Sequence, residues 1–139
     1  MNQIKLELAA KSENVSLARV VAAAFLTPYD ATVEEVTDIK TAISEAVTNS
    51  IIHGYDEKDG IVTMELSFEE NILTIKISDS GVGIENVETA IEPLFTTKPD
   101  MERSGLGFTV MDSFTDTLEV KSTVGGGTTV TMTRKFGGV

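Results

Sequence analysis

Three short polar motifs follow one another along this chain, and together they contain the residue types that nucleotide chemistry requires. They are Glu45–Asn49, Asp79–Gly83 and Gly105–Gly107. Each motif alone is a weak signal, because short polar and glycine-rich segments are common in turns and at helix ends. In this order they supply an amide that can bind a metal ion, a carboxylate that can read a base, and glycine turns that can approach phosphates.

The first motif places an acid and an amide on one face of an expected helix. Glu45, Asn49 and His53 follow at intervals of four residues, in a helix expected to run from an N-cap at Thr32 to a C-cap at Gly54. A solvated helix face explains any one of these side chains. The amide oxygen of Asn49 also suits a Mg²⁺ ion that carries phosphate oxygens and waters, and Glu45 could act as a general base. His53 is interpreted as a structural or rim residue.

The second and third motifs suggest a base contact and a phosphate contact. Asp79 ends an expected strand, where its carboxylate could accept a hydrogen bond from an exocyclic amino group such as that of adenine. Gly81 and Gly83 would let the backbone approach a flat base, although a strand-ending turn explains them equally well. Gly105–Gly107 precedes an expected helix, whose N-terminal N–H groups could bind phosphate. The alternative for this motif is an ordinary flexible start of a helix.

Residues 92–104 are polar and weakly periodic, which predicts a mobile loop. Lys98 and Arg103 in this loop could fold over a triphosphate, and an arginine can stabilise a phosphoryl group in transfer; otherwise both are solvated charges. A second glycine run, Gly125–Gly127, leads into an expected strand and is assigned to a hairpin. The chain has neither a Walker motif nor a protein-kinase signature.

The periodicity predicts an α/β protein whose 139 residues form one domain, residues 1–139. The order of elements is a strand, two helices, a hairpin, the loop, a helix and a second hairpin. This order favours a two-layer α/β sandwich, in which a mixed or mostly antiparallel sheet carries helices on one face. Expected strands cover residues 4–8, 61–68, 73–79, 118–122 and 128–133. Expected helices cover residues 12–25, with Ser12 as N-cap, 32–54 and a stretch from about 106, and a short helix is allowed over 84–91.

The composition narrows the classes of partner. The chain has 22 acidic and 11 basic residues, a formal net charge of −11, which disfavours nucleic acid and anionic membranes and favours a basic protein. It has no cysteine, and its longest apolar run, Val20–Leu26, is too short to span a bilayer. We therefore expect a cytoplasmic protein.

The three motifs resemble the N-box, G1 box and G2 box of the GHKL superfamily of ATPases and kinases. Ser44–Tyr55, Pro93–Pro99 and Glu102–Phe108 further resemble the bacterial anti-sigma serine kinases, most closely those of sporulation. The resemblance implies a Bergerat-type fold with a mobile lid over ATP. It also implies that the chain sequesters a sigma factor, uses Mg-ATP to phosphorylate a serine on an anti-anti-sigma antagonist, and forms a homodimer.

The resemblance also implies roles for single residues. Asn49 would bind Mg²⁺, Glu45 would be the base, Asp79 would contact adenine and Arg103 would face the γ-phosphate. Arg19, in the first helix, would contact a partner, unless it is simply a surface charge. The remaining residues implied at the nucleotide site are Gly81, Gly83, Thr97, Gly105, Gly107 and Thr128.

Three alternatives stay open. The chain could be a nucleotide-gated binding module without phosphoryl transfer, or an anti-sigma kinase of the general stress pathway, whose members share the same boxes. It could also be a small-molecule phosphotransferase or a detached ATPase domain of a histidine kinase. Residues 18–26 argue against this last alternative, because their apolar side chains cover more of the helix than one packing face needs.

Overall fold

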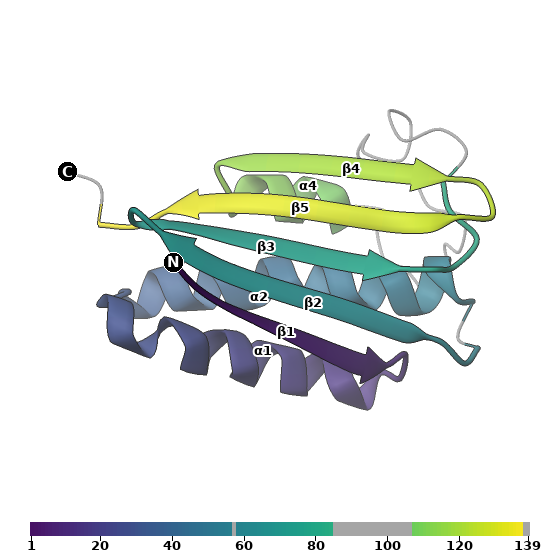
Figure 1. Cartoon of the computed structure of the whole chain (residues 1–139), viewed down its shortest axis with the longest axis horizontal. Coiled ribbons are helices and arrows are strands. Elements are labelled where there is room, and N and C mark those ends of the chain that lie inside the picture. Colours follow the sequence, from purple (N-terminus) through teal and green to yellow (C-terminus); the bar gives the residue numbers. More distant parts are fainter. Residues whose placement is uncertain (57, 85–106, 138–139) are drawn as a thin grey trace.

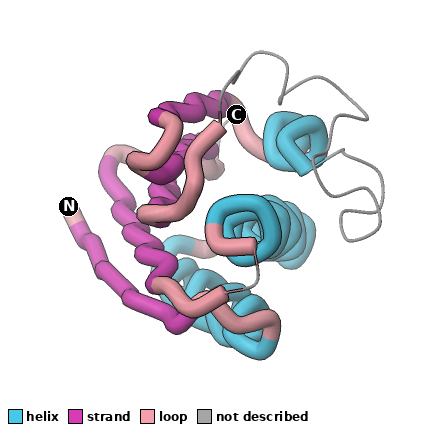
Figure 2. Tube along the Cα trace, turned by 90° about the vertical axis from the view of Figure 1, so that its right-hand side faces the viewer, coloured by secondary structure: helices cyan, strands magenta, loops and turns pink. Residues whose placement is uncertain are grey.

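The computed structural model describes residues 1–56, 58–84 and 107–137, which form two layers. One layer is a five-stranded sheet of order β1-β2-β3-β5-β4, and the helices cover one of its faces (Figure 1). Figure 2 shows the two layers edge-on, with the other face of the sheet open. The two-layer α/β sandwich is therefore confirmed. The described elements have the following bounds: β1 Asn2–Ala9, α1 Glu13–Leu26, a 3-10 turn Thr27–Tyr29, α2 Val33–Asn49, a π-helical turn Ser50–Gly54, β2 Ile61–Glu69, β3 Ile72–Asp79, α4 Gly107–Ser113, β4 Thr117–Thr123 and β5 Gly127–Lys135.

Every strand pairing in the described sheet is antiparallel, so the sheet is not mixed. Two hairpins, β2–β3 and β4–β5, account for two of the pairings. Between β1 and β2 the chain runs through α1 and back through α2, so it returns to the same end of the sheet before β2 begins (Figure 1). A pair of antiparallel helices thus makes the two strands that it joins antiparallel as well.

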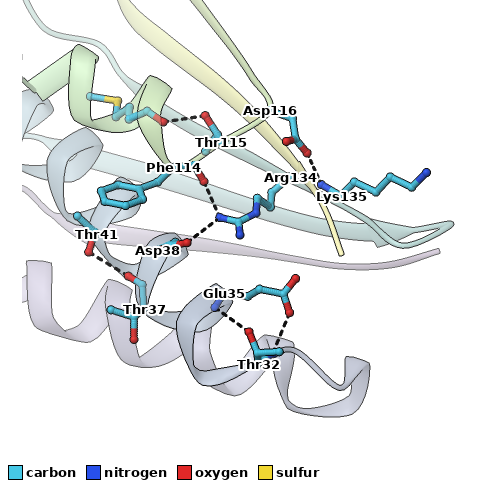
Figure 3. A network of polar contacts seen from close by, with 11 residues as sticks. Thr32, Glu35, Thr37, Asp38, Thr41, Phe114, Thr115, Asp116, Arg134 and Lys135 are labelled. Carbon is cyan, nitrogen blue, oxygen red and sulfur yellow. Dashed lines mark hydrogen bonds and ion pairs between the residues drawn. The ribbon is translucent and has the colours of Figure 1, made fainter. Parts of the chain in front are cut away.

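The two long helices begin differently. At α2 the Thr32 hydroxyl accepts a hydrogen bond from the N–H of Glu35 at 3.0 Å, and the Glu35 carboxylate accepts one from the N–H of Thr32 at 2.9 Å (Figure 3). This capping box confirms the predicted start of the helix. The expected cap at Ser12 is wrong in its chemistry, because Ser12 precedes α1 but its side chain makes no capping hydrogen bond. Its backbone is already helical, with φ −53° and ψ −36°, whereas a capping residue is normally extended.

The core lies between the sheet and the helices. Alternate residues of β2 and β3 face the helices and are buried, and α2 adds Ile39, Ile43 and Val47. The same alternation continues to the end of β3, where the inward position is held by Asp79, and its partner on β5 is Thr128. A polar pair therefore stands at one end of an otherwise apolar face.

The second helix changes its winding before it ends. Ser50–Gly54 forms a π-helical turn, in which the N–H of Tyr55 donates to the carbonyl of Ser50 at 3.0 Å. Gly54 is the last residue of this turn and Tyr55 follows as the capping residue, so the prediction of Gly54 as a C-cap is wrong. Single π-turns occur frequently at functional sites. None of the helices in residues 1–56, 58–84 and 107–137 is long and apolar enough to cross a membrane.

A polar network connects the C-terminal end of α4 with β5 and α2 (Figure 3). Arg134 on β5 donates to the Asp38 carboxylate of α2 at 3.1 Å and to the carbonyl of Phe114, just after α4, at 2.9 Å. The N–H of Asp116 donates to Thr133 at 2.7 Å. The short helix that begins at Gly107 is thus held by both layers.

Candidate functional site

The carboxylate of Asp79 is buried at the end of β3 and is held by the backbone. Its Oδ1 accepts hydrogen bonds from the N–H of Gly81 at 2.9 Å and from the N–H of Thr128 at 3.3 Å. Burial of a charge is costly unless hydrogen bonds compensate, and these two bonds also fix the orientation of the carboxylate. No residue in the described part of the chain donates to Oδ2, which leaves this oxygen for a ligand.

Two hydroxyl groups extend this polar site across the neighbouring strands. Ser122 on β4 pairs in register with Thr128, and their hydroxyl oxygens lie 2.8 Å apart. The Ser122 hydroxyl donates to the carbonyl of Gly127 at 2.9 Å and accepts from the N–H of Ile84 at 2.7 Å. Because the proton of Ser122 is committed to Gly127, Thr128 is the donor between the two hydroxyls. Asp79, Thr128 and Ser122 therefore form one polar row on the face that carries the helices.

The motif after Asp79 lies directly against the end of the π-helical turn. The N–H of Val82 donates to the carbonyl of Gly54 at 2.9 Å. A Cβ atom on Gly81 would stand 2.0 Å from that carbonyl oxygen, and a Cβ on Gly54 would stand 3.0 Å from the Asp79 carboxylate. Glycine at both positions lets two backbone segments and a carboxylate approach one another closely.

The other side of the same loop is fastened to the β4–β5 turn. The N–H of Gly125 donates to the carbonyl of Val82 at 2.7 Å. Gly83 has a φ of +79°, and a Cβ there would stand 2.1 Å from the carbonyl oxygen of Thr123. The assignment of the second glycine run to a hairpin is confirmed, because β4 and β5 are joined there. The loop from Asp79 to Gly83 is thus held on two sides.

Helix α2 brings the first motif toward this site. Glu45 and Asn49 lie one turn apart on α2, and both are half-buried rather than fully solvated. Asn49 is the last α-helical residue, and the π-helical turn that ends at Gly54 follows it directly. His53 lies in the π-helical turn, where a spacing of four residues is still close to one turn, so its place on the stripe of Glu45 and Asn49 stays a prediction.

Several predicted site residues lie outside the residues that the structure describes. They are Thr97, Lys98, Arg103 and Gly105, together with the expected lid and all of the expected short helix over 84–91 except Ile84. Gly107 is described and begins α4, as predicted.

The first helix has an exposed face next to its buried one. Ala18, Ala22, Phe25 and Leu26 are buried, whereas Arg19 is exposed. Leu17 and Val20 are also exposed, by 46% and 63%. Part of the apolar surface of α1 therefore stays exposed to solvent, as the composition of the helix predicted.

Sequence reasoning missed two members of the site. Ser122 interrupts the inward-facing positions that Leu118 and Val120 occupy on β4, and a polar residue in that register was a readable signal. Tyr55 lies six residues after the first motif, and its hydroxyl joins the start of β2 to the end of β3, which a local pattern does not reveal.

The chain matches the family model described as the histidine kinase-like ATPase domain over residues 8–134. It is 54% identical over 135 residues to the anti-sigma F factor of Clostridium acetobutylicum, a match that covers 97% of this chain and 94% of the relative. It is also 54% identical over 136 residues to the anti-sigma F factor of a Thermoanaerobacter species, with coverage of 98% and 95%. The chain belongs to this ATPase domain family, among the anti-sigma F factors.

Two solved structures show the same fold. The RsbU and RsbW domains of Rv1364c from Mycobacterium tuberculosis match with a TM-score of 0.69 at 18% identity, over 97% of this chain and 32% of that one. The catalytic domain of the histidine kinase ThkA matches with a TM-score of 0.59 at 16% identity, over 97% of each chain. The two structures confirm the sandwich fold, and the match to the histidine kinase-like ATPase domain gives its family.

Proposed function

We propose that this chain is an anti-sigma factor that sequesters a sporulation sigma factor from RNA polymerase and, with Mg-ATP, phosphorylates a serine on an anti-anti-sigma antagonist. The observation that carries the proposal is the buried, backbone-held carboxylate of Asp79 beside the end of α2. The relatives that are 54% identical are anti-sigma F factors, which supports the sigma-binding half of the proposal.

The polar row suits an adenine nucleotide. In this proposal, Asp79 Oδ2 accepts a hydrogen bond from the exocyclic amino group of adenine, while Oδ1 stays committed to the backbone. Gly81 and Gly83 lie beside the base, and Thr128 contributes its hydroxyl. A fixed acceptor is well suited to discriminate bases, because a mismatched ligand leaves a buried carboxylate oxygen without a donor.

The first motif supplies the groups for phosphoryl transfer. Asn49 offers an amide oxygen, a hard neutral ligand that fits Mg²⁺ when phosphates and waters fill the other positions, and the ion would neutralise phosphate charge. Glu45 accepts the proton of the substrate serine as its oxygen attacks the γ-phosphoryl group, and ADP leaves. The other residues proposed at the phosphates are Thr97, Lys98, Arg103, Gly105 and Gly107.

The sigma factor is proposed to bind the exposed face of α1 around Arg19. The exposed surface of α1 carries the charge of Arg19 and, at other positions around the helix, the apolar side chains of Leu17 and Val20, a mixture typical of protein interfaces. The formal net charge of −11 favours a basic partner surface and a fast association rate. We also propose that the chain acts as a cytoplasmic homodimer, on the basis of the family resemblance.

A reconstituted transcription assay tests the sequestration. The chain, added with Mg-ATP to RNA polymerase and a sporulation sigma factor, should abolish transcription from a promoter that depends on that sigma factor. An Arg19→Ala variant should inhibit less, and Lys11→Ala is the control because Lys11 is exposed and precedes α1. Full transcription in the presence of excess wild-type chain would refute the proposal.

A second function, a nucleotide-gated binding module, is favoured by one observation. The carboxylate of Asp79 is oriented by two backbone hydrogen bonds, and a base contact there needs no phosphoryl transfer to respond to ATP or ADP. This alternative predicts that sigma binding depends on the nucleotide while no phosphoserine forms on any antagonist.

A further inference from the structure

The hydroxyl of Tyr55 is inserted between the ends of β2 and β3. The ladder between these strands begins at the pair Thr63 and Ser78. Continued in the same register, it would bring Val62 opposite Asp79 and then Ile61 opposite Ser80. Instead, Tyr55 Oη donates to the carbonyl of Ile61 at 2.6 Å and accepts from the N–H of Ser80 at 2.7 Å. One phenol group thus satisfies the two backbone groups that a continued ladder would join.

The inserted hydroxyl keeps the strand ends apart. Two hydrogen bonds in series separate the two backbone atoms by about 4–5 Å, compared with about 2.9 Å for one direct bond. An open pocket of about 400 Å³ lies at this fork, lined by residues of both strand ends. The tyrosine ring rests on Gly60, where a Cβ atom would stand 2.5 Å from the ring. The Tyr55 ring therefore packs closely against Gly60 and leaves no space for a side chain there.

The inserted hydroxyl of Tyr55 lies next to Asp79 and can therefore affect the position of the Asp79 side chain. Ser80, which donates to Tyr55, is the residue after Asp79. Gly54, which precedes Tyr55, lies against the Asp79 carboxylate. Two consecutive residues at the end of the π-turn therefore border the functional side chain of β3: Gly54 packs against the carboxylate, and Tyr55 bonds the backbone of the next residue.

We propose that Tyr55 is a positioning residue for base recognition, whose hydroxyl sets the place of the Asp79 carboxylate and hence the preference for adenine. Without the hydroxyl, Ile61 and Ser80 can pair directly, and the end of β3 moves toward β2. The carboxylate then leaves the position in which it meets an exocyclic amino group. The inference rests on the proposed role of Asp79 as the residue that contacts adenine.

The test compares ATP with inosine triphosphate, which carries a carbonyl oxygen in place of the exocyclic amino group. Dissociation constants for both are measured by calorimetry for the wild type, Tyr55→Phe, Asp79→Asn and the double variant. Tyr55→Phe should bind ATP about ten-fold more weakly, the loss expected from misalignment of one hydrogen bond to a charged group, and its affinity for inosine triphosphate should change less than about two-fold. Tyr55→Phe should cost no further ATP affinity once Asp79 is replaced.

The control is Tyr29→Phe, which removes a hydroxyl that bonds the side chain of Asn2 at 2.9 Å and should leave both affinities unchanged. A purely structural loss in Tyr55→Phe would weaken both nucleotides equally and would persist in the Asp79→Asn background, which overturns the inference. If the wild type prefers ATP through Asp79 and Tyr55→Phe keeps that preference in full, the inference is also overturned. A wild type without any preference for ATP overturns the proposed adenine contact and the inference together.

Discussion

Replacement of Gly81 by alanine tests the closest contact in the site. The backbone of Gly81 does not lie in the left-handed region, so alanine is excluded by space alone and not by conformation. The new Cβ would stand 2.0 Å from the carbonyl oxygen of Gly54, and real Cβ atoms essentially never come within 3.0 Å of another heavy atom. The loop and the π-turn must therefore separate by about 1 Å or more.

This separation lowers the free energy of unfolding. Overpacking costs about 1–3 kcal/mol, and the hydrogen bond from Val82 to Gly54 is worth about 1 kcal/mol. Alanine also adds about 0.4–1 kcal/mol to the free energy of unfolding, because it restricts the conformations of the unfolded chain. We expect a net loss of about 2 kcal/mol in the free energy of unfolding, and a fall in melting temperature of about 6 °C for a domain of this size. The affinity for ATP should fall about ten-fold or more, because Gly81 also donates to Asp79.

Urea denaturation measures the stability and calorimetric titration measures the affinity. The matched control is Gly126→Ala, at an exposed turn position where the nearest atom to a new Cβ is 3.3 Å away. That variant should change the free energy of unfolding by less than about 0.5 kcal/mol. If Gly81→Ala kept both the stability and the ATP affinity of the wild type, the close approach of the two segments would not matter and the reasoning would be refuted.

Three further predictions concern the metal contact, the ion pair and the helix cap. Asn49→Ala should weaken ATP binding in the presence of Mg²⁺ and should leave binding in EDTA unchanged; an unchanged dependence on Mg²⁺ in calorimetry would contradict a ligand role. Arg134→Leu should cost about 2–4 kcal/mol in urea denaturation, because the partly buried Asp38 loses its cation and the carbonyl of Phe114 loses its donor. Adding Asp38→Asn to Arg134→Leu should recover part of this loss, and an additional loss would count against the ion pair. Thr32→Ala should cost about 1 kcal/mol, whereas Thr37→Ala on the exposed side of the same helix should cost less than half of that; equal costs would argue against the capping box.

Local patterns predicted the elements because each pattern depends on neighbouring residues. Alternating apolar residues gave the strands, since side chains in a strand face opposite sides in turn. The same alternation placed Asp79 at the end of β3, and the structure shows that its side chain faces inward. The capping box at Thr32 could be recognised because both of its partners lie within one turn.

The features that patterns missed depend on distant segments or on a subtle change of winding. The π-turn over Ser50–Gly54 differs from an α-helix by one residue in a single turn, which hydrophobic spacing does not resolve. The reason for glycine at position 54 is its contact with Asp79, which is 25 positions further along the chain. The insertion of Tyr55 depends on how two strand ends diverge, and only the assembled sheet reveals it.

Transfer of labelled phosphate tests the central claim most directly. The chain is incubated with Mg²⁺, γ-labelled ATP and an anti-anti-sigma domain, alongside Glu45→Gln and the control Glu34→Gln, which makes the same change of charge at an exposed position of α2. The account predicts label on a serine of the antagonist, transfer reduced roughly 10²–10⁴-fold in Glu45→Gln, and wild-type transfer in Glu34→Gln. An antagonist that stays unlabelled while ATP binding is intact would contradict the kinase account, and undiminished transfer by Glu45→Gln would remove Glu45 from the mechanism.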